Sequence, residues 1–124
     1  MIVELSLPVV LAVAAGGGLG AVARYLLDTY LPGGLLIANT AGSLLLGVML
    51  GIAAAGGAGW HPLVLGLCAA GFFGALTTFA TLALRAAQLW VAGERISAAG
   101  LWLVHVGAGL PAAALGAWLG WMVG

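Results

Sequence analysis

The chain has 124 residues, of which 65% are hydrophobic and only 5% are charged, and its formal net charge is zero. A water-soluble domain needs far more charged surface, so this composition excludes one and predicts an integral membrane protein. Three basic residues in all are also too few for a nucleic-acid-binding surface.

Apolar runs and the breakers between them predict an all-α membrane protein with four transmembrane helices, each near the roughly 20 residues that a bilayer needs. The predicted spans are residues 5–27, 34–55, 62–91 and 96–122, within one domain that covers residues 1–124. The third span is long enough for a tilted or interrupted helix. Pro111 removes one backbone hydrogen bond from the fourth span and predicts a kink there. An even number of spans puts both termini on the same side.

The arginines indicate the orientation of the first span and of the whole chain. Arg24, Arg85 and Arg95 all lie at or toward the side that holds the two odd-numbered loops. The positive-inside rule then puts both termini outside the cytoplasm. Arg24 itself, near the end of the first span, is either an anchor that snorkels to the interface or a positive charge that concentrates anions at a pore mouth.

Small residues recur every fourth position in three of the spans, and each series lies on one helix face. The series are Gly16-x3-Gly20, Ser43-x3-Gly47-x3-Gly51 and Gly116-x3-Gly120-x3-Gly124. They predict close contact between helices and say nothing about chemistry.

Asn39 lies about five residues into the second span, where its amide needs a partner. A structural hydrogen bond between helices and an NH2 group that faces an anion are both consistent with this position.

The third span contains an unusual stretch, which reads Gly71-Phe72-Phe73-Gly74-Ala75-Leu76-Thr77-Thr78-Phe79-Ala80-Thr81-Leu82. Two glycines three apart loosen the backbone, and two adjacent threonines offer hydroxyls that bond nearby carbonyls in place of the regular ladder. Irregular backbone at this depth survives only inside protein or beside water. A broken helix here is therefore a candidate ion or substrate site. The alternative is that the small residues only let helices pack closely.

Two further ionisable side chains lie within the predicted spans. Arg85 precedes the end of the third span by about two turns, and such residues usually face an interior or water. His105, in the fourth span, is either a satisfied core imidazole or a pore-lining group with pH sensitivity. No nucleophile and base are paired in the sequence, so we do not expect an enzyme.

Three blocks of residues, taken together, resemble the Fluc/CrcB family of fluoride channels over nearly the whole chain. The blocks are Gly17-Gly18-Leu19-Gly20-Ala21-Val22-Ala23-Arg24-Tyr25, Pro32-Gly33-Gly34-Leu35-Leu36-Ile37-Ala38-Asn39-Thr40-Ala41-Gly42-Ser43 and Gly71-Phe72-Phe73-Gly74-Ala75-Leu76-Thr77-Thr78-Phe79. The third block is the most specific of them.

The resemblance implies a four-helix subunit that pairs antiparallel with a second subunit and encloses two narrow pores. It also implies a central Na⁺ ion at the dimer interface, held by backbone carbonyls of the broken third helix. The matching positions in this chain are Gly74 and Thr77. Carbonyls freed by a helix break are hard oxygen ligands that suit a small cation.

The resemblance further implies which residues line the pores. Phe79 matches a phenylalanine whose ring edge is electropositive and accepts an anion, Asn39 matches the asparagine of the second helix, and Arg24 matches the arginine of the first. The remaining candidates for contact with the anion are Thr78, Thr81, Arg85 and His105. The expected function is passive, selective export of fluoride from the cytoplasm across the cell membrane.

The sequence departs from the family pattern at several pore positions. The threonine usual after the second-helix glycine is Leu35, and the run after the break reads Phe79-Ala80-Thr81-Leu82, which lacks the second phenylalanine. A glutamate of the family is Arg85, and a serine or asparagine of the fourth helix aligns with His105.

These departures leave several hypotheses open. One is a homodimeric channel in which Arg85 and His105 supply replacement anion contacts. Another is a pore-degenerate subunit of a heterodimer with a paralogous partner, which the arginine bias slightly favours. A third is an assembly subunit that no longer conducts. A small multidrug-type transporter would need a carboxylate deep in the first helix, whereas Glu4 lies ahead of the span or at its start.

Overall fold

The computed structural model describes residues 5–56 and 59–124. These residues form four helical stretches that are long and apolar enough to cross a membrane, Leu7–Tyr30, Gly34–Ala54, Pro62–Val91 and Arg95–Val123. The predicted all-α membrane fold with four transmembrane helices is confirmed. Glu4, the acid relevant to a multidrug-type transporter, lies outside the described residues.

The first, second and fourth stretches are each one continuous helix, whereas the third consists of several segments. Helix α1 is Leu7–Tyr30, α2 is Gly34–Ala54 and α6 is Arg95–Val123. The third stretch consists of α3 Pro62–Val64, the π-helix η1 Leu65–Phe73, α4 Gly74–Leu76 and α5 Phe79–Val91. Helix α6 continues through Pro111 without interruption.

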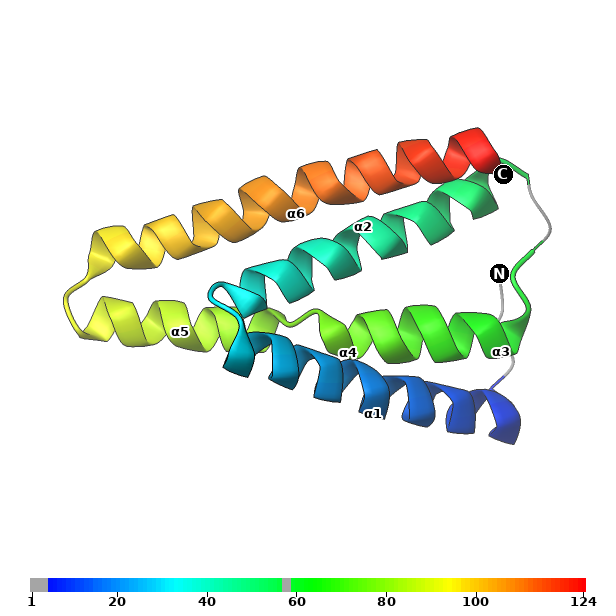
Figure 1. The fold of residues 1–124 in the computed structure, drawn as a ribbon, viewed down its shortest axis with the longest axis horizontal. Coiled ribbons are helices and arrows are strands. Elements are labelled where there is room, and N and C mark those ends of the chain that lie inside the picture. Colours follow the sequence, from blue (N-terminus) through cyan, green and yellow to red (C-terminus); the bar gives the residue numbers. More distant parts are fainter. Residues whose placement is uncertain (1–4, 57–58) are drawn as a thin grey trace.

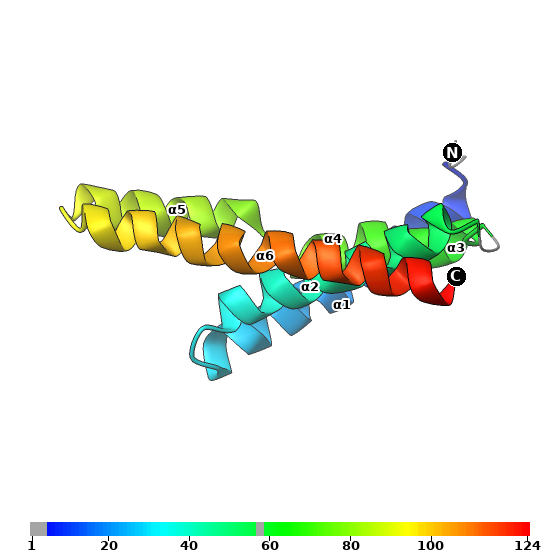
Figure 2. The same ribbon diagram turned by 90° about the horizontal axis from the view of Figure 1, so that it is seen from above.

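The helices pack in pairs along the long axis of the molecule. Helix α1 lies along η1 and α4, α2 lies along α6, and α5 lies beside the first half of α6 (Figure 1). The start of α1 and the end of α6 are at the same end of the molecule, as an even number of spans requires (Figure 1). Seen from above, the turn between α1 and α2 diverges from the turn between α5 and α6 (Figure 2).

Glycines on both helices bring α2 and α6 into backbone contact. Gly47 and Gly51 of α2 face α6, and Gly116 and Gly120 of α6 face α2. A Cβ atom on any of these four residues would overlap a backbone carbonyl oxygen of the other helix. Because lipid tails are as apolar as leucine, such close contact provides the attraction between helices in a membrane. The helix faces predicted from the small-residue spacing are therefore contact faces.

Glycines also bring α1 into backbone contact with the π-helix η1. Cβ atoms on Gly16 and Gly20 would overlap the carbonyl oxygens of Leu67 and Phe72. A Cβ atom on Gly71 would lie 2.8 Å from the carbonyl oxygen of Val13. Gly71 is therefore required for packing, and it lies within a helix rather than at a break.

The third transmembrane stretch is broken at two threonines. Thr77 has φ −81° and ψ 146°, and Thr78 has φ −148° and ψ 121°, so both are extended. The predicted break is confirmed, but its proposed cause needs correction. Gly74 keeps helical dihedrals (φ −62°, ψ −38°), so the two glycines do not unwind the chain, and the break follows them.

Candidate functional site

Asn39 of α2 binds the backbone of Thr78 at the break. The Thr78 N–H donates to Asn39 Oδ1 over 2.7 Å, and Asn39 Nδ2 donates to the Thr78 carbonyl over 3.3 Å. Asn39 therefore forms the interhelical hydrogen bond that was one of its two predicted roles. A carboxamide carries two N–H donors, so one donor of Asn39 remains for a ligand.

The bond to Asn39 takes a donor away from the helical ladder. In an uninterrupted α-helix the Thr78 N–H would bond the carbonyl of Gly74, four residues earlier. The last N–H that bonds back across α4 is that of Thr77, which donates to the Phe73 carbonyl over 3.1 Å. The Gly74 carbonyl therefore loses its ladder partner.

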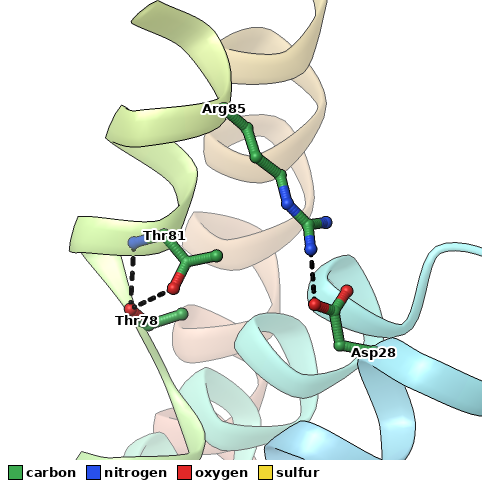
Figure 3. A network of polar contacts seen from close by, with 4 residues as sticks. All are labelled: Asp28, Thr78, Thr81 and Arg85. Atoms are coloured by element: carbon green, nitrogen blue, oxygen red, sulfur yellow. Dashed lines mark hydrogen bonds and ion pairs between the residues drawn. The ribbon is translucent and has the colours of Figure 1, made fainter. Parts of the chain in front are cut away.

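Thr78 also caps the second half of the broken helix. Its Oγ1 accepts from the Thr81 N–H over 3.2 Å and donates to Thr81 Oγ1 over 3.3 Å (Figure 3). This is the usual role of a threonine at the N-cap position. The Thr81 N–H would otherwise bond the carbonyl of Thr77, so this second carbonyl also loses its partner.

By the same rule the carbonyls of Ala75 and Leu76 also lose their ladder partners, so the carbonyls released at the break include those of the two predicted cation ligands, Gly74 and Thr77. The Thr77 hydroxyl is not released with them, because it donates back to the Phe73 carbonyl over 3.0 Å. Unpaired carbonyls at membrane depth cost several kcal/mol unless they meet a cation, a donor or water. In the described part of the chain no group of three His, Cys, Asp or Glu side chains could hold a metal. The released main-chain oxygens are hard ligands that suit a small cation.

Beside the break lies an open groove of about 310 Å³ between α2, α5 and α6. We call it the break groove; its lining includes Asn39, Ser43, Thr77, Thr78, Phe79, Leu82, Trp102 and His105. The first residue of α5, Phe79, is 72% exposed, and its ring centroid lies 5.2 Å from that of Trp102. The groove therefore combines amide and hydroxyl groups with an exposed aromatic ring. Four of the sequence-predicted pore residues (Asn39, Thr78, Phe79 and His105) meet in it.

His105 is the one buried polar or charged residue of the described chain, with 9% of its surface exposed. Its Nδ1 lies 2.9 Å from the Leu101 carbonyl. A carbonyl only accepts, so Nδ1 carries the hydrogen of this bond. Nε2 is buried without a partner. His105 is thus only half satisfied: Nδ1 has the partner expected of a core imidazole, and Nε2 has none.

Arg85 forms an ion pair with Asp28, which lies in the last turns of α1 (Figure 3). The pair joins α5 to the end of α1. The sequence predicts Arg85 as an anion contact, but the structure gives its guanidinium a carboxylate partner within the chain. Asp28 was missed, although an acid near a span end, on the same side as the arginines, could have indicated it. For Arg24, which is half-buried, the described residues provide no ion pair or hydrogen bond.

We expect the ion pair to contribute modestly to stability, because the two side chains are 43% and 27% exposed. Asp28→Asn or Arg85→Gln should each lower the free energy of unfolding by about 0.5–1 kcal/mol. The double reversal Asp28→Arg with Arg85→Asp should recover most of this loss, as thermal unfolding in detergent would measure. Glu94→Gln is the matched control, and a reversal no more stable than the single variants would contradict the pairing.

The positions that depart from the family pattern are mostly buried in the subunit. Leu35 and Leu82 are 2% and 5% exposed, whereas Ala80 is exposed. Leu82 contributes to the wall of the break groove. The groove therefore has an aliphatic wall where the family pattern has a second ring.

Comparison with known proteins places these features in a family. Residues 11–117 match the family model described as CrcB-like protein, Camphor Resistance (CrcB). The protein named Fluoride-specific ion channel FluC 1 of Leifsonia xyli subsp. xyli is 42% identical over 123 residues, covering 90% of this chain and 86% of the relative. FluC 1 of Symbiobacterium thermophilum is 38% identical over 119 residues, covering 88% and 94%. FluC 2 of Natronomonas pharaonis is 40% identical over 113 residues, covering 89% and 92%.

Proposed function

This chain belongs to the CrcB-like family, and on that premise we propose that it is a fluoride-selective channel through which fluoride leaves the cytoplasm passively. The named relatives are ion channels, which are not an enzyme class. The four apolar helices make the chain a multi-pass protein of the cell membrane. The relatives do not favour the alternative of a pore-degenerate subunit that pairs with a paralogue.

The observation that carries the proposal is the break groove, with its polar groups at membrane depth. A fluoride ion gives up hydration to cross hydrocarbon, and hydrogen-bond donors must replace the lost water. The second N–H of Asn39 and the hydroxyl of Thr81 can donate, whereas the Thr78 hydroxyl already donates to Thr81 Oγ1. The ring edge of Phe79 carries partial positive charge. Asn39 and Phe79 line the open groove, and Thr81 is bonded to Thr78 of its lining.

We propose that a second copy of this chain packs antiparallel against the subunit and encloses its groove. Phe79 is largely exposed and Gly74 is exposed in the single subunit, so both are available to a partner. Each copy would then contribute one broken helix to the interface and one groove to a pore. All 124 residues act as one four-helix membrane domain in this arrangement.

The released carbonyls support the proposal of a cation between the two copies. Gly74 and Thr77 would hold Na⁺ through main-chain oxygens, which are the hard ligands that a small cation prefers. When bound, the ion would supply positive charge that offsets the charge of permeating fluoride. The side chains around it keep the carbonyls free, since Asn39 and the Thr78 hydroxyl occupy the N–H groups that would otherwise bond them.

Halide efflux from liposomes tests the function. The purified chain is reconstituted alone into liposomes loaded with either fluoride or chloride, and an ion-selective electrode follows efflux. We expect rapid, passive fluoride efflux and chloride efflux no faster than from protein-free liposomes. No fluoride efflux, or equal rates for the two halides, would contradict the proposal. If fluoride passes only when a paralogous chain is added, the channel is a heterodimer and the proposed homodimer is wrong.

Withdrawal of Na⁺ tests the cation site separately. If Na⁺ is replaced by the bulky cation N-methylglucamine throughout purification, we expect the thermal midpoint and the dimer fraction to fall. A ligand present at about a hundred times its dissociation constant stabilises by about 2.7 kcal/mol, so the change should be readily measured. Addition of Na⁺ should reverse it. Equal stability with and without Na⁺ would contradict the proposed cation site but not the proposal that the chain conducts fluoride.

A further inference from the structure

His105 lies between two cavities. One is the break groove. The other, of about 310 Å³, lies toward the Asp28–Arg85 ion pair, and its lining includes Gly33, Leu36, Arg85, Ser97, Leu101 and His105. We call this second cavity the arginine vestibule. Among the residues that line either cavity, His105 alone lines both. An ion that moves along the subunit between the two cavities would therefore pass this imidazole.

The hydrogen bonding of His105 determines which nitrogen is available. Nδ1–H donates to the Leu101 carbonyl over 2.9 Å, so in the neutral ring Nε2 carries only a lone pair. That lone pair is buried without a donor, and a buried polar atom left unpaired is unfavourable. A lone pair also repels an anion. Protonation of Nε2 reverses both effects, because it creates a charged N–H donor that needs an anionic partner.

Among the described residues no carboxylate lines either cavity, so none there could pair with a charged His105. Helix α5 contributes Arg85 to the lining of the vestibule, and Asp28 of α1, outside that lining, pairs with Arg85. No other residue that lines the two cavities is charged or titratable, and α2 contributes the neutral Asn39 to the break groove. The ion pair is neutral as a unit, so an imidazolium at His105 would have no carboxylate of its own. A small anion from solvent would fill this role.

We propose that His105 is a halide-binding residue that acts as an imidazolium, donating Nε2–H to fluoride as the ion passes between the arginine vestibule and the break groove. This inference rests on the proposed function and adds a linkage between proton and anion. Fluoride binds the protonated ring, so binding and flux are stronger in acid than in alkaline solution. The proton comes from water and returns to it, and no covalent bond to fluoride forms.

Ring signals of His105 test binding without any need for transport. The chain has two histidines, and His61 is exposed in a loop, where its Nδ1 accepts from the Leu63 N–H. His61→Gln therefore leaves one imidazole to observe by NMR in detergent micelles with isotopically labelled histidine. We expect fluoride to move the His105 signals at about pH 5, with half of the effect requiring on the order of tenfold more fluoride at about pH 8, because only the protonated ring donates a charged Nε2–H to the anion. No shift, or one that is independent of pH, would overturn the proposal.

Flux measurements supply the second readout. His105→Gln keeps an amide donor but never gains charge, and His61→Gln is the matched control. We expect wild type and His61→Gln to pass fluoride roughly tenfold faster at about pH 5 than at about pH 8, because the charged hydrogen bond from His105 is made only by the protonated ring, after subtraction of leak through protein-free liposomes, and His105→Gln to lose this ratio. A His105→Gln variant that retains the wild-type ratio would overturn the proposal. If wild type passes no fluoride at either pH, the proposed function fails, and the NMR titration still decides whether His105 binds halide.

Discussion

Replacing Asn39 with Ala is expected to lower fluoride flux by about tenfold to a hundredfold. A hydrogen bond to a charged group contributes about 1.5–3 kcal/mol, and each 1.4 kcal/mol corresponds to about tenfold. The substitution removes an N–H that can replace water around the ion. It also leaves the Thr78 N–H and carbonyl without their partner, which frees that N–H to rejoin the ladder to Gly74. Electrode-detected efflux from liposomes would measure the loss.

Two further variants separate the possible causes of this effect. Ser43→Ala is the control, since Ser43 lines the same groove and its hydroxyl makes no hydrogen bond in the described structure; the flux of this variant should remain within about twofold of wild type. Asn39→Asp keeps the Oδ1 acceptor for Thr78 but loses the donor and adds negative charge, so it should preserve the break and still block fluoride. If Asn39→Ala conducts like Ser43→Ala, Asn39 is not a pore residue.

Replacing Gly120 with Ala is expected to destabilise the subunit by about 3 kcal/mol, at the upper end of the usual cost of overpacking. A Cβ atom at this position would overlap the Val48 carbonyl oxygen and lie 2.9 Å from the Ile52 nitrogen. Both of these are backbone atoms of α2, so no side chain can rotate away. The helices would have to separate along the whole interface.

Gly107→Ala, on the same helix α6, is the matched control. No atom lies within 4 Å of a Cβ built at Gly107, and Ala favours a helix over Gly by up to about 1 kcal/mol. This variant should be as stable as wild type or slightly more stable. Thermal unfolding and the monodisperse fraction in size-exclusion chromatography would compare the two. Equal midpoints for Gly120→Ala and Gly107→Ala would show that backbone contact between α2 and α6 does not hold the subunit together.

Much of the fold could be predicted from the sequence, because hydrocarbon imposes simple constraints. Spans need about 20 apolar residues, and the four helices follow from that requirement. Spacing by four places small residues on one face, so the contact faces of α2 and α6 could also be predicted. The pairing of those two faces could not, since spacing identifies a face but not its partner.

That the third helix is broken could be predicted from the sequence, whereas the hydrogen bonds at the break could not. Adjacent threonines can either back-bond within a helix or cap a new one, and this chain does both. Thr77 bonds back to Phe73, whereas Thr78 caps α5. The choice depends on Asn39, which lies 39 positions away in sequence from Thr78. The π-helix from Leu65 to Phe73 also went unpredicted, because a one-residue change in hydrogen-bond register has no compositional signature.

The ionisable residues were the hardest to interpret, because their roles depend on neighbours from other helices. Arg85 was identified as an intramembrane charge, but its partner Asp28 lies 57 positions away. The position of His105 inside the membrane was predicted, but not that one ring nitrogen is bonded and the other unpaired. That distinction depends on the Leu101 carbonyl, which accepts from Nδ1, and on the lack of a hydrogen-bond partner for Nε2 among the described residues.

The central claim, that the chain by itself forms a passive and fluoride-selective path, is tested most directly by recording currents across a planar bilayer that contains only this protein. With a fluoride gradient across the membrane and equal chloride and Na⁺ on both sides, we predict a current that reverses at the equilibrium potential of fluoride. A current that reverses at zero voltage would show a path without fluoride selectivity. The absence of any current at all voltages would contradict the channel itself.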